Sequence, residues 1–64
     1  MYALFINDIH VADLYVDEEL SSWQTYLYFS KFVKNIDKKA KMISRSNTQF
    51  LFSCTGKEFA FVKQ

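Results

Sequence analysis

The chain has 64 residues, of which half are hydrophobic and 19% are aromatic, and its formal net charge is +1. This length allows one domain with one core, and a domain so small is only marginally stable. A single cysteine and a single histidine exclude an internal disulfide and a structural zinc site, and no apolar run reaches the roughly 18 residues of a membrane span. Aromatic packing or self-association must therefore supply the stability of the fold.

The first six residues are too short for the apolar part of a secretory signal and include no basic residue. We therefore expect a cytoplasmic protein in which Cys54 is reduced. Residues with AT-rich codons dominate the composition: Lys, Asn, Ile, Phe and Tyr occupy 25 positions, whereas Gly, Ala, Arg and Pro occupy six. In composition alone, the chain resembles the compact early proteins of AT-rich bacteriophages.

Alternating apolar residues on both sides of Asn7 and Asp8 predict a β-hairpin, because Asn and Asp tolerate the positive φ angles of a tight turn. Counting outward from a two-residue turn predicts four pairs: Ile6 with Ile9, Phe5 with His10, Leu4 with Val11, and Ala3 with Ala12. Ile6, Ile9, Leu4 and Val11 are then expected to share one face. The opposite face, with Phe5, His10 and the two alanines, is expected to be more exposed.

A helix is expected after this hairpin. Asp17 is a suitable N-cap, and Glu18 and Glu19 in the first turn would favour the positive end of the helix dipole, so the helix is expected to begin there. The alternative start lies four residues later, because Ser21 and Gln24 have the spacing of a capping box.

The helix is expected to pack one face on a sheet. At 100° per residue, the polar Ser21, Gln24, Lys31 and Asn35 lie opposite a stripe of Ser22, Tyr26, Phe29, Val33 and Ile36, which should meet the sheet. Two apolar flanks remain, formed by Leu20, Trp23 and Leu27 on one side and by Tyr28 and Phe32 on the other. We expect a strongly twisted sheet to cover both flanks. The alternative leaves one flank exposed for a partner, and Tyr28 is then the clearest candidate.

Strands are expected again after residue 41, first at Met42 to Arg45 and then on both sides of a Thr55-Gly56 turn. This turn pairs Phe52 with Phe59 and Phe50 with Phe61, so four phenylalanines should form one wall against the helix. Leu51, Ala60 and Val62 are expected on the reverse face. The predicted fold is a single α+β domain over residues 1–64 with the order β-β-α-β-β-β, in which one helix packs on an antiparallel sheet. The place of the strand at 42–45 in that sheet stays open.

No residue pattern indicates a chemical site. Cys54 is the only thiol and His10 the only imidazole that could activate it, and a lone Cys before a hairpin turn is more often part of the packing. The single glycine rules out a phosphate-binding loop, and no calcium-binding loop is present. We therefore expect no enzymatic activity, no cofactor and no metal.

Charge is unevenly distributed along the chain. Five of the seven acidic residues fall in the first 19 positions, and six basic residues fall between positions 31 and 45: Lys31, Lys34, Lys38, Lys39, Lys41 and Arg45. Lysines near the end of a helix offset its negative pole and keep the following loop solvated. The functional interpretation is attraction to an anionic partner, either a nucleic acid or an acidic protein surface.

The leading hypothesis is a non-enzymatic module that docks on a larger protein, as an inhibitor or modulator of a host enzyme or defence complex encoded by a phage or mobile element. Trp23, Tyr28 and Phe32 are the candidate anchors. Lys38, Lys39, Lys41 and Arg45, or the acidic Asp13, Asp17, Glu18 and Glu19, are the candidate rim. The alternative is a small RNA- or DNA-binding protein that uses the basic stretch 31–45. Homodimer formation through an exposed helix flank is compatible with both.

Overall fold

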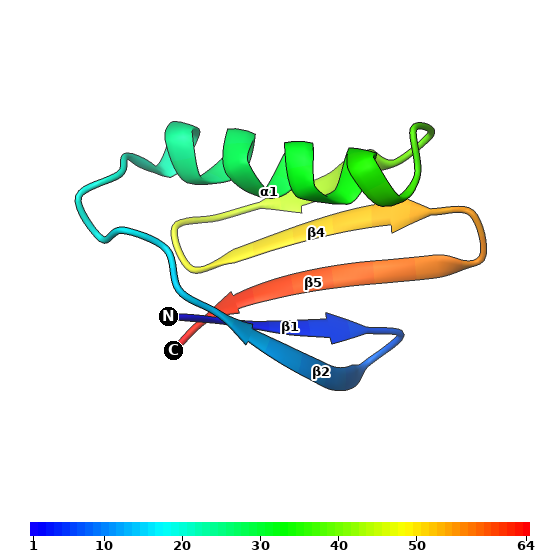
Figure 1. Cartoon of the computed structure of the whole chain (residues 1–64), viewed down its shortest axis with the longest axis horizontal. Coiled ribbons are helices and arrows are strands. Elements are labelled where there is room, and N and C mark those ends of the chain that lie inside the picture. The colour runs from blue at the N-terminus through cyan, green and yellow to red at the C-terminus, as the bar shows by residue number, and fades with distance from the viewer.

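The computed structural model describes all 64 residues and contains one α-helix and five β-strands. The strands are β1 (Tyr2–Ile6), β2 (Ile9–Leu14), β3 (Lys41–Arg45), β4 (Gln49–Cys54) and β5 (Lys57–Lys63), and the helix α1 (Ser22–Ile36) connects β2 to β3. The helix lies along one face of the sheet (Figure 1). The predicted order β-β-α-β-β-β and the α+β class are confirmed.

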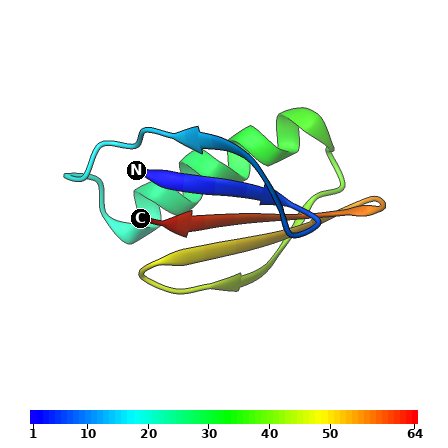
Figure 2. The ribbon, with the colours of Figure 1, turned by 90° about the horizontal axis from the view of Figure 1, so that it is seen from below.

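All five strands belong to one antiparallel sheet with the order β2-β1-β5-β4-β3. β3, whose place in the sheet the sequence leaves open, forms one edge of this sheet, and β2 forms the other edge. The first and last strands are neighbours at the centre, and the backbone N–H of Gln64 donates to the carbonyl oxygen of Met1 at 2.9 Å. Figure 2 shows the two termini side by side, with the helix lying behind the strands and crossing them obliquely.

The first hairpin has the predicted turn but only half of the predicted register. Asn7 and Asp8 both adopt positive φ, at 51° and 68°, and Ile6 pairs with Ile9 and Phe5 with His10 as expected. The register then shifts by one residue, because Leu4 pairs with Ala12 instead of Val11. Val11 is the extra residue of a β-bulge.

This bulge changes which residues of β2 face the helix. Ala12 and Leu14 pack against the core beside the buried Leu4, whereas Val11 and Ile9 are exposed. The predicted shared face of Ile6, Ile9, Leu4 and Val11 is therefore wrong for Val11. A regular register would have placed the Asp13 carboxylate on the helix face, and the bulge puts Leu14 there in its place.

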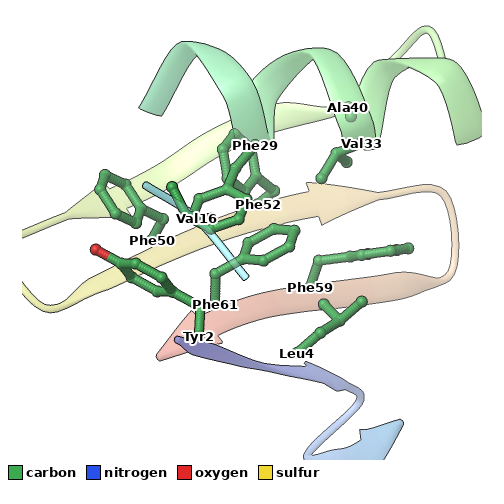
Figure 3. Packing of buried hydrophobic residues seen from close by; sticks show 10 residues of the cluster. All are labelled: Tyr2, Leu4, Val16, Phe29, Val33, Ala40, Phe50, Phe52, Phe59 and Phe61. Carbon is green, nitrogen blue, oxygen red and sulfur yellow. The ribbon is translucent and has the colours of Figure 1, made fainter. Parts of the chain in front are cut away.

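The second hairpin follows its prediction closely. The turn at Thr55 and Gly56 pairs Phe52 with Phe59 and Phe50 with Phe61, and all four rings are at most 2% exposed. They form the wall of a cluster that meets the helix through Phe29 and Val33 (Figure 3). The other members of this cluster come from β1 and from the segments that flank the helix: Tyr2, Leu4, Val16 and Ala40.

The helix begins at Ser22, and Ser21 is its N-cap. The Ser21 hydroxyl accepts from the backbone N–H of Gln24 at 3.2 Å, and the Gln24 side chain accepts from the backbone N–H of Ser21 at 2.9 Å. This capping box satisfies two backbone donors that would otherwise have no partner. The expected start at Asp17 is wrong, because Asp17 lies in a separate turn in which it accepts from the Glu19 backbone.

The buried face of the helix differs at both ends from the predicted stripe. Phe29 and Val33 are buried and Tyr26 packs against the core, but Ser22 and Ile36 are exposed. These two are the first and last residues of the helix. Thr25, which is buried, takes the inner position in the first turn, and its hydroxyl donates to the Ser21 carbonyl oxygen at 3.0 Å.

Candidate interaction surfaces

The seven candidate contact residues lie on two flanks of the helix and in the connection to β3. Trp23 lies on the flank that faces β3, since the Arg45 guanidinium carbon of β3 is 5.5 Å from its ring centroid. Phe32 lies on the opposite flank, in edge contact with Phe61 of β5. Tyr28 shares that flank, one turn earlier. The sequence-predicted anchors therefore belong to two separate surfaces.

We call the first of these the Trp23 surface: Trp23, Tyr26, Leu27, Met42 and Arg45. The Trp23 and Tyr26 rings are 5.2 Å apart, and the Arg45 guanidinium carbon lies 5.4 Å from the Tyr26 centroid as well as close to Trp23. Tyr26 itself stacks on the buried Phe52. Cation–π contacts of this kind order an aromatic side chain, and Trp23 is nevertheless 57% exposed.

The apolar part of the Trp23 surface extends beyond the indole. Leu27 follows Trp23 by one helical turn and is exposed. Met42 pairs with Phe52, which places its side chain on the helix side of β3, and it is also exposed. The surface thus combines an ordered aromatic ring with two flexible apolar side chains, a composition that is common at the centre of protein interfaces.

The second surface is a shallow groove on the other flank, lined by Tyr28, Lys31, Phe32 and Asn35. Tyr28 is 50% exposed, but Phe32 is half-buried and packs against the core. The expectation that a twisted sheet covers both flanks is wrong, because each flank leaves one aromatic residue half-exposed.

The basic residues between positions 31 and 45 do not form one patch, because Lys34, Lys38 and Lys39 lie near the C-terminal end of the helix and Arg45 lies beside Trp23 near its N-terminal end. Lys38 and Lys39 lie in the connection to β3, while Lys41 pairs with Ser53 and therefore points to the face of the sheet opposite Arg45. All of them are exposed, and none forms an ion pair with a carboxylate. The acidic residues that precede the helix lie at its other end, so the charge of the molecule is polarised along the helix axis.

Asp37, the one acidic residue within the basic stretch 31–45, connects three parts of the fold. It follows the helix as its C-cap, one carboxylate oxygen accepts from the Lys39 backbone at 2.9 Å, and the other accepts from the Thr55 backbone at 2.8 Å. The hydrogen bond from Thr55, followed by that from Lys39, lowers the pKa of Asp37. The signal for this role was an Asp directly after the last apolar helical residue.

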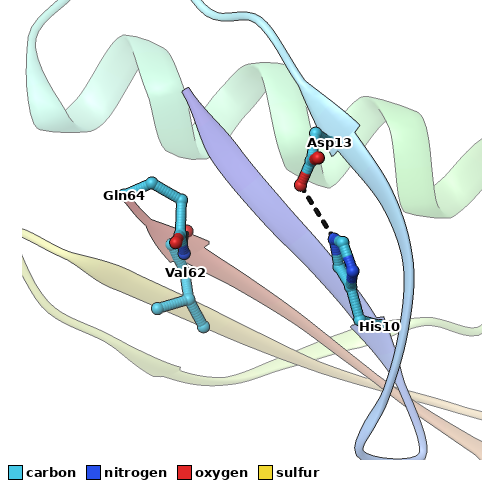
Figure 4. Close-up of polar contacts among 4 residues, drawn as sticks. All are labelled: His10, Asp13, Val62 and Gln64. Atoms are coloured by element: carbon cyan, nitrogen blue, oxygen red, sulfur yellow. Dashed lines mark hydrogen bonds and ion pairs between the residues drawn. The ribbon is translucent and has the colours of Figure 1, made fainter.

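The reverse face of the sheet carries no second layer of structure. Its centre is apolar, with Phe5, Leu51, Ala60 and Val62 half-buried. Toward the β2 edge, the Nε2 atom of His10 lies 2.8 Å from the Asp13 carboxylate (Figure 4). The Phe5 ring packs beside the imidazole. His10 and Asp13 are three residues apart and lie on the same face because of the bulge at Val11.

Cys54 and His10 do not meet. Cys54 packs against the core on the helix face, whereas His10 lies on the reverse face. Burial, followed by the negative charge of Asp37, raises the pKa of the Cys54 thiol, so the thiol is protonated at neutral pH. No group of three or more His, Cys, Asp or Glu side chains is arranged so that it could hold a metal ion.

The helix α1 is too short and too polar to cross a membrane, and the fold has no other helix. Comparison of the chain with protein-family models, with curated proteins and with solved structures found no match.

Proposed function

We propose that this chain is a non-enzymatic interaction module that docks on a larger protein through the Trp23 surface. The observation that carries the proposal is that Arg45 and Tyr26 both contact a half-exposed tryptophan, and these contacts favour one position of its ring. An ordered side chain loses little conformational entropy on binding, so its burial contributes more fully to affinity. Trp, Tyr and Arg are also the residue types that dominate the binding energy of protein interfaces.

The polarised charge supports the same proposal. Lys34, Lys38 and Lys39 lie near one end of the helix, and Asp17, Glu18 and Glu19 lie near the other. Complementary charges on a partner would orient the approach and raise the association rate more than the affinity. The proposed partner is a host enzyme or defence complex in the bacterial cytoplasm, and the proposed role of the chain is that of an inhibitor or modulator encoded by a phage or mobile element.

The second candidate is nucleic-acid binding by the exposed basic residues between positions 31 and 45, none of which is paired with a carboxylate. Two observations weigh against it. Lys41 and Arg45 point to opposite faces of the sheet, so they do not continue one basic groove. The Arg45 guanidinium also stacks on two rings of its own chain.

The test is affinity capture from bacterial lysate with three forms of the chain: wild type, Trp23→Ala and Tyr28→Ala. Tyr28 is the matched control, because it is a comparably exposed aromatic residue on the other flank of the same helix. We expect one stoichiometric protein that survives nuclease treatment, is lost with Trp23→Ala and is retained with Tyr28→Ala.

Two outcomes would contradict this proposal. Loss of all captured species on nuclease treatment, with purified RNA binding that weakens steeply as salt rises, would favour the nucleic-acid alternative. Retention by Trp23→Ala together with loss by Tyr28→Ala would move the docking site to the groove between Tyr28 and Phe32.

A further inference from the structure

The sheet has two open edges, because β2 pairs only with β1 and β3 pairs only with β4. An edge strand presents unpaired backbone N–H and C=O groups, and proteins commonly protect such edges with lysine or arginine. The β3 edge has this protection from Lys41 and Arg45. Lys41 lies on the reverse face of this strand and Arg45 on the helix face, so a second strand paired here would meet a cation on each face.

The β2 edge lacks this protection. Its six residues, Ile9–Leu14, include no Lys or Arg, and Ile9 and Val11 are both exposed on it. No loop or helix segment pairs with its outer side. The two edges of the sheet are therefore chemically different.

The bulge at Val11 restricts what can pair with this edge. It places His10 and Asp13 on the same face of the sheet although they are three residues apart. In a regular strand, the residues on one face are two or four positions apart. Such a strand therefore cannot place one side chain opposite His10 and another opposite Asp13 on the same face. A second copy of β2 in antiparallel orientation carries the same extra residue at the matching position.

We propose that two copies of the chain associate by pairing their β2 strands antiparallel, about a twofold axis between Val11 and Ala12. His10 then lies opposite the partner's Asp13, Ile9 opposite the partner's Leu14, and Val11 opposite the partner's Ala12. The two five-stranded sheets join into one continuous sheet. The partner is a second copy of this chain because its β2 strand matches the irregular edge.

Both faces of the joined edge are complementary. On the reverse face, each Asp13 lies between the imidazole of its own chain, 2.8 Å away, and the partner's His10. On the helix face, Ile9 and Leu14 form two apolar cross-strand pairs related by the twofold axis. The Trp23 surface lies toward the opposite edge of the sheet and stays free, so the dimer would present two docking surfaces.

An interface of two six-residue strands is small, so the dimer should be weak, with a dissociation constant on the order of 100 µM. The test is sedimentation velocity of the purified full chain from about 10 µM to about 1 mM. The wild-type chain should change from monomer to dimer across this range, so its sedimentation coefficient should rise with the loading concentration. A chain that stays monomeric throughout overturns the proposal.

Two lysine variants test which edge strand forms the dimer. Val11→Lys and Ile43→Lys both replace a β-branched residue at the register shift of an edge strand, and the wild-type side chains are 50% and 53% exposed. Val11→Lys should weaken dimerisation at least tenfold, while Ile43→Lys should leave it unchanged. Circular dichroism checks that each variant is folded. A dimer that survives Val11→Lys, through the helix flanks or the β3 edge, overturns the proposal.

A charge exchange tests the register. His10→Asp places two carboxylates opposite one another in each symmetric pair and should weaken the dimer. Adding Asp13→His in the same chain restores opposite partners across the axis and should recover the wild-type dissociation constant within about threefold. Both side chains are exposed, so the monomer tolerates the exchange. A double variant no tighter than His10→Asp alone overturns the assigned register.

Discussion

The ring of Phe29, on the helix, stacks on the ring of Phe61 in β5, with centroids 4.1 Å apart and planes inclined by only 14°. Both side chains are completely buried. Phe61 also makes edge contacts with Phe32 and Phe52, so one residue of the central strand touches both the helix and the neighbouring strand. The attachment of the helix to the sheet depends on this ring.

Phe61→Ala is therefore expected to unfold most of the protein. Replacing a buried Phe by Ala typically costs about 3 to 5 kcal/mol, which is close to the whole stability of a domain this small. Thermal unfolding followed by circular dichroism measures the effect. Leu51→Ala is the control, because Leu51 is half-buried on the reverse face, and it should unfold at a temperature much closer to that of the wild type.

Ser21→Ala is expected to destabilise the protein by about 1 kcal/mol, because it removes the hydroxyl that accepts from the Gln24 backbone. Asp17→Ala should cost less, since Asp17 lies outside the helix. Urea denaturation of both variants measures the difference. A larger loss from Asp17→Ala would contradict the position of the N-cap.

Acid should weaken the link between the helix and the last hairpin. The folded-state pKa of Asp37 is lowered from its ordinary value of 3.8, so its carboxylate stabilises the fold above that value, and the stabilisation is lost as pH falls through the folded-state pKa. Asp37→Asn should lower the unfolding temperature at pH 7. As the pH is lowered below about 4, the unfolding temperature of this variant should fall less than that of the wild type. Glu19→Gln, on an exposed side chain, is the control. If the unfolding temperature of Asp37→Asn falls with acid as much as that of the wild type, the stabilising role of the Asp37 carboxylate is contradicted.

Arg45→Ala should release the Trp23 side chain while leaving the fold intact. Exposed cation–π contacts contribute on the order of 0.5 to 1 kcal/mol, so the unfolding temperature should change little. Trp23 is the only tryptophan, and its fluorescence anisotropy reports the motion of this ring directly. The anisotropy should fall in Arg45→Ala and stay at the wild-type value in Lys41→Ala.

The second hairpin and the phenylalanine wall were predictable because local chemistry and apolar alternation agree there. The turn uses the only glycine, Gly56, whose φ is +73°, and each strand carries two Phe residues at alternating positions. The position of β3 was not predictable, because its sequence, KMISR, has no strong alternation. Contacts within the whole fold, and not a local pattern, determine that β3 pairs with β4.

The bulge had a signal in the sequence that simple counting overlooked. Extending the two-residue turn regularly places Asp13 opposite Tyr2, on the face that packs against the helix. An ionised carboxylate in that position would lose its hydration without a charged partner, whereas Leu14 fills the same position at no such cost. Because Leu14 suits the position opposite Tyr2 better than Asp13 does, one extra residue is expected in the strand between the turn and Asp13.

The candidate anchors were predictable only as residue types. Helical periodicity placed Trp23 and Phe32 on opposite flanks, which is correct, but it could not show that Arg45 reaches the indole from a strand 22 positions later. Nor could it show that Phe32 is held by Phe61. Both facts depend on the order of strands in the sheet, which a single sequence does not encode in local patterns.

The adjacency of β1 and β5 has a consequence for folding kinetics. These strands join the two ends of the chain, so their pairing closes the longest loop in the fold and gives the protein a high contact order. A circular permutant with a short peptide bridge from Gln64 to Met1 and new ends near Glu19 would have a helix followed by five strands joined only by sequential hairpins. Because every strand pair then forms between chain neighbours, the permutant should refold faster than the natural order of the same residues.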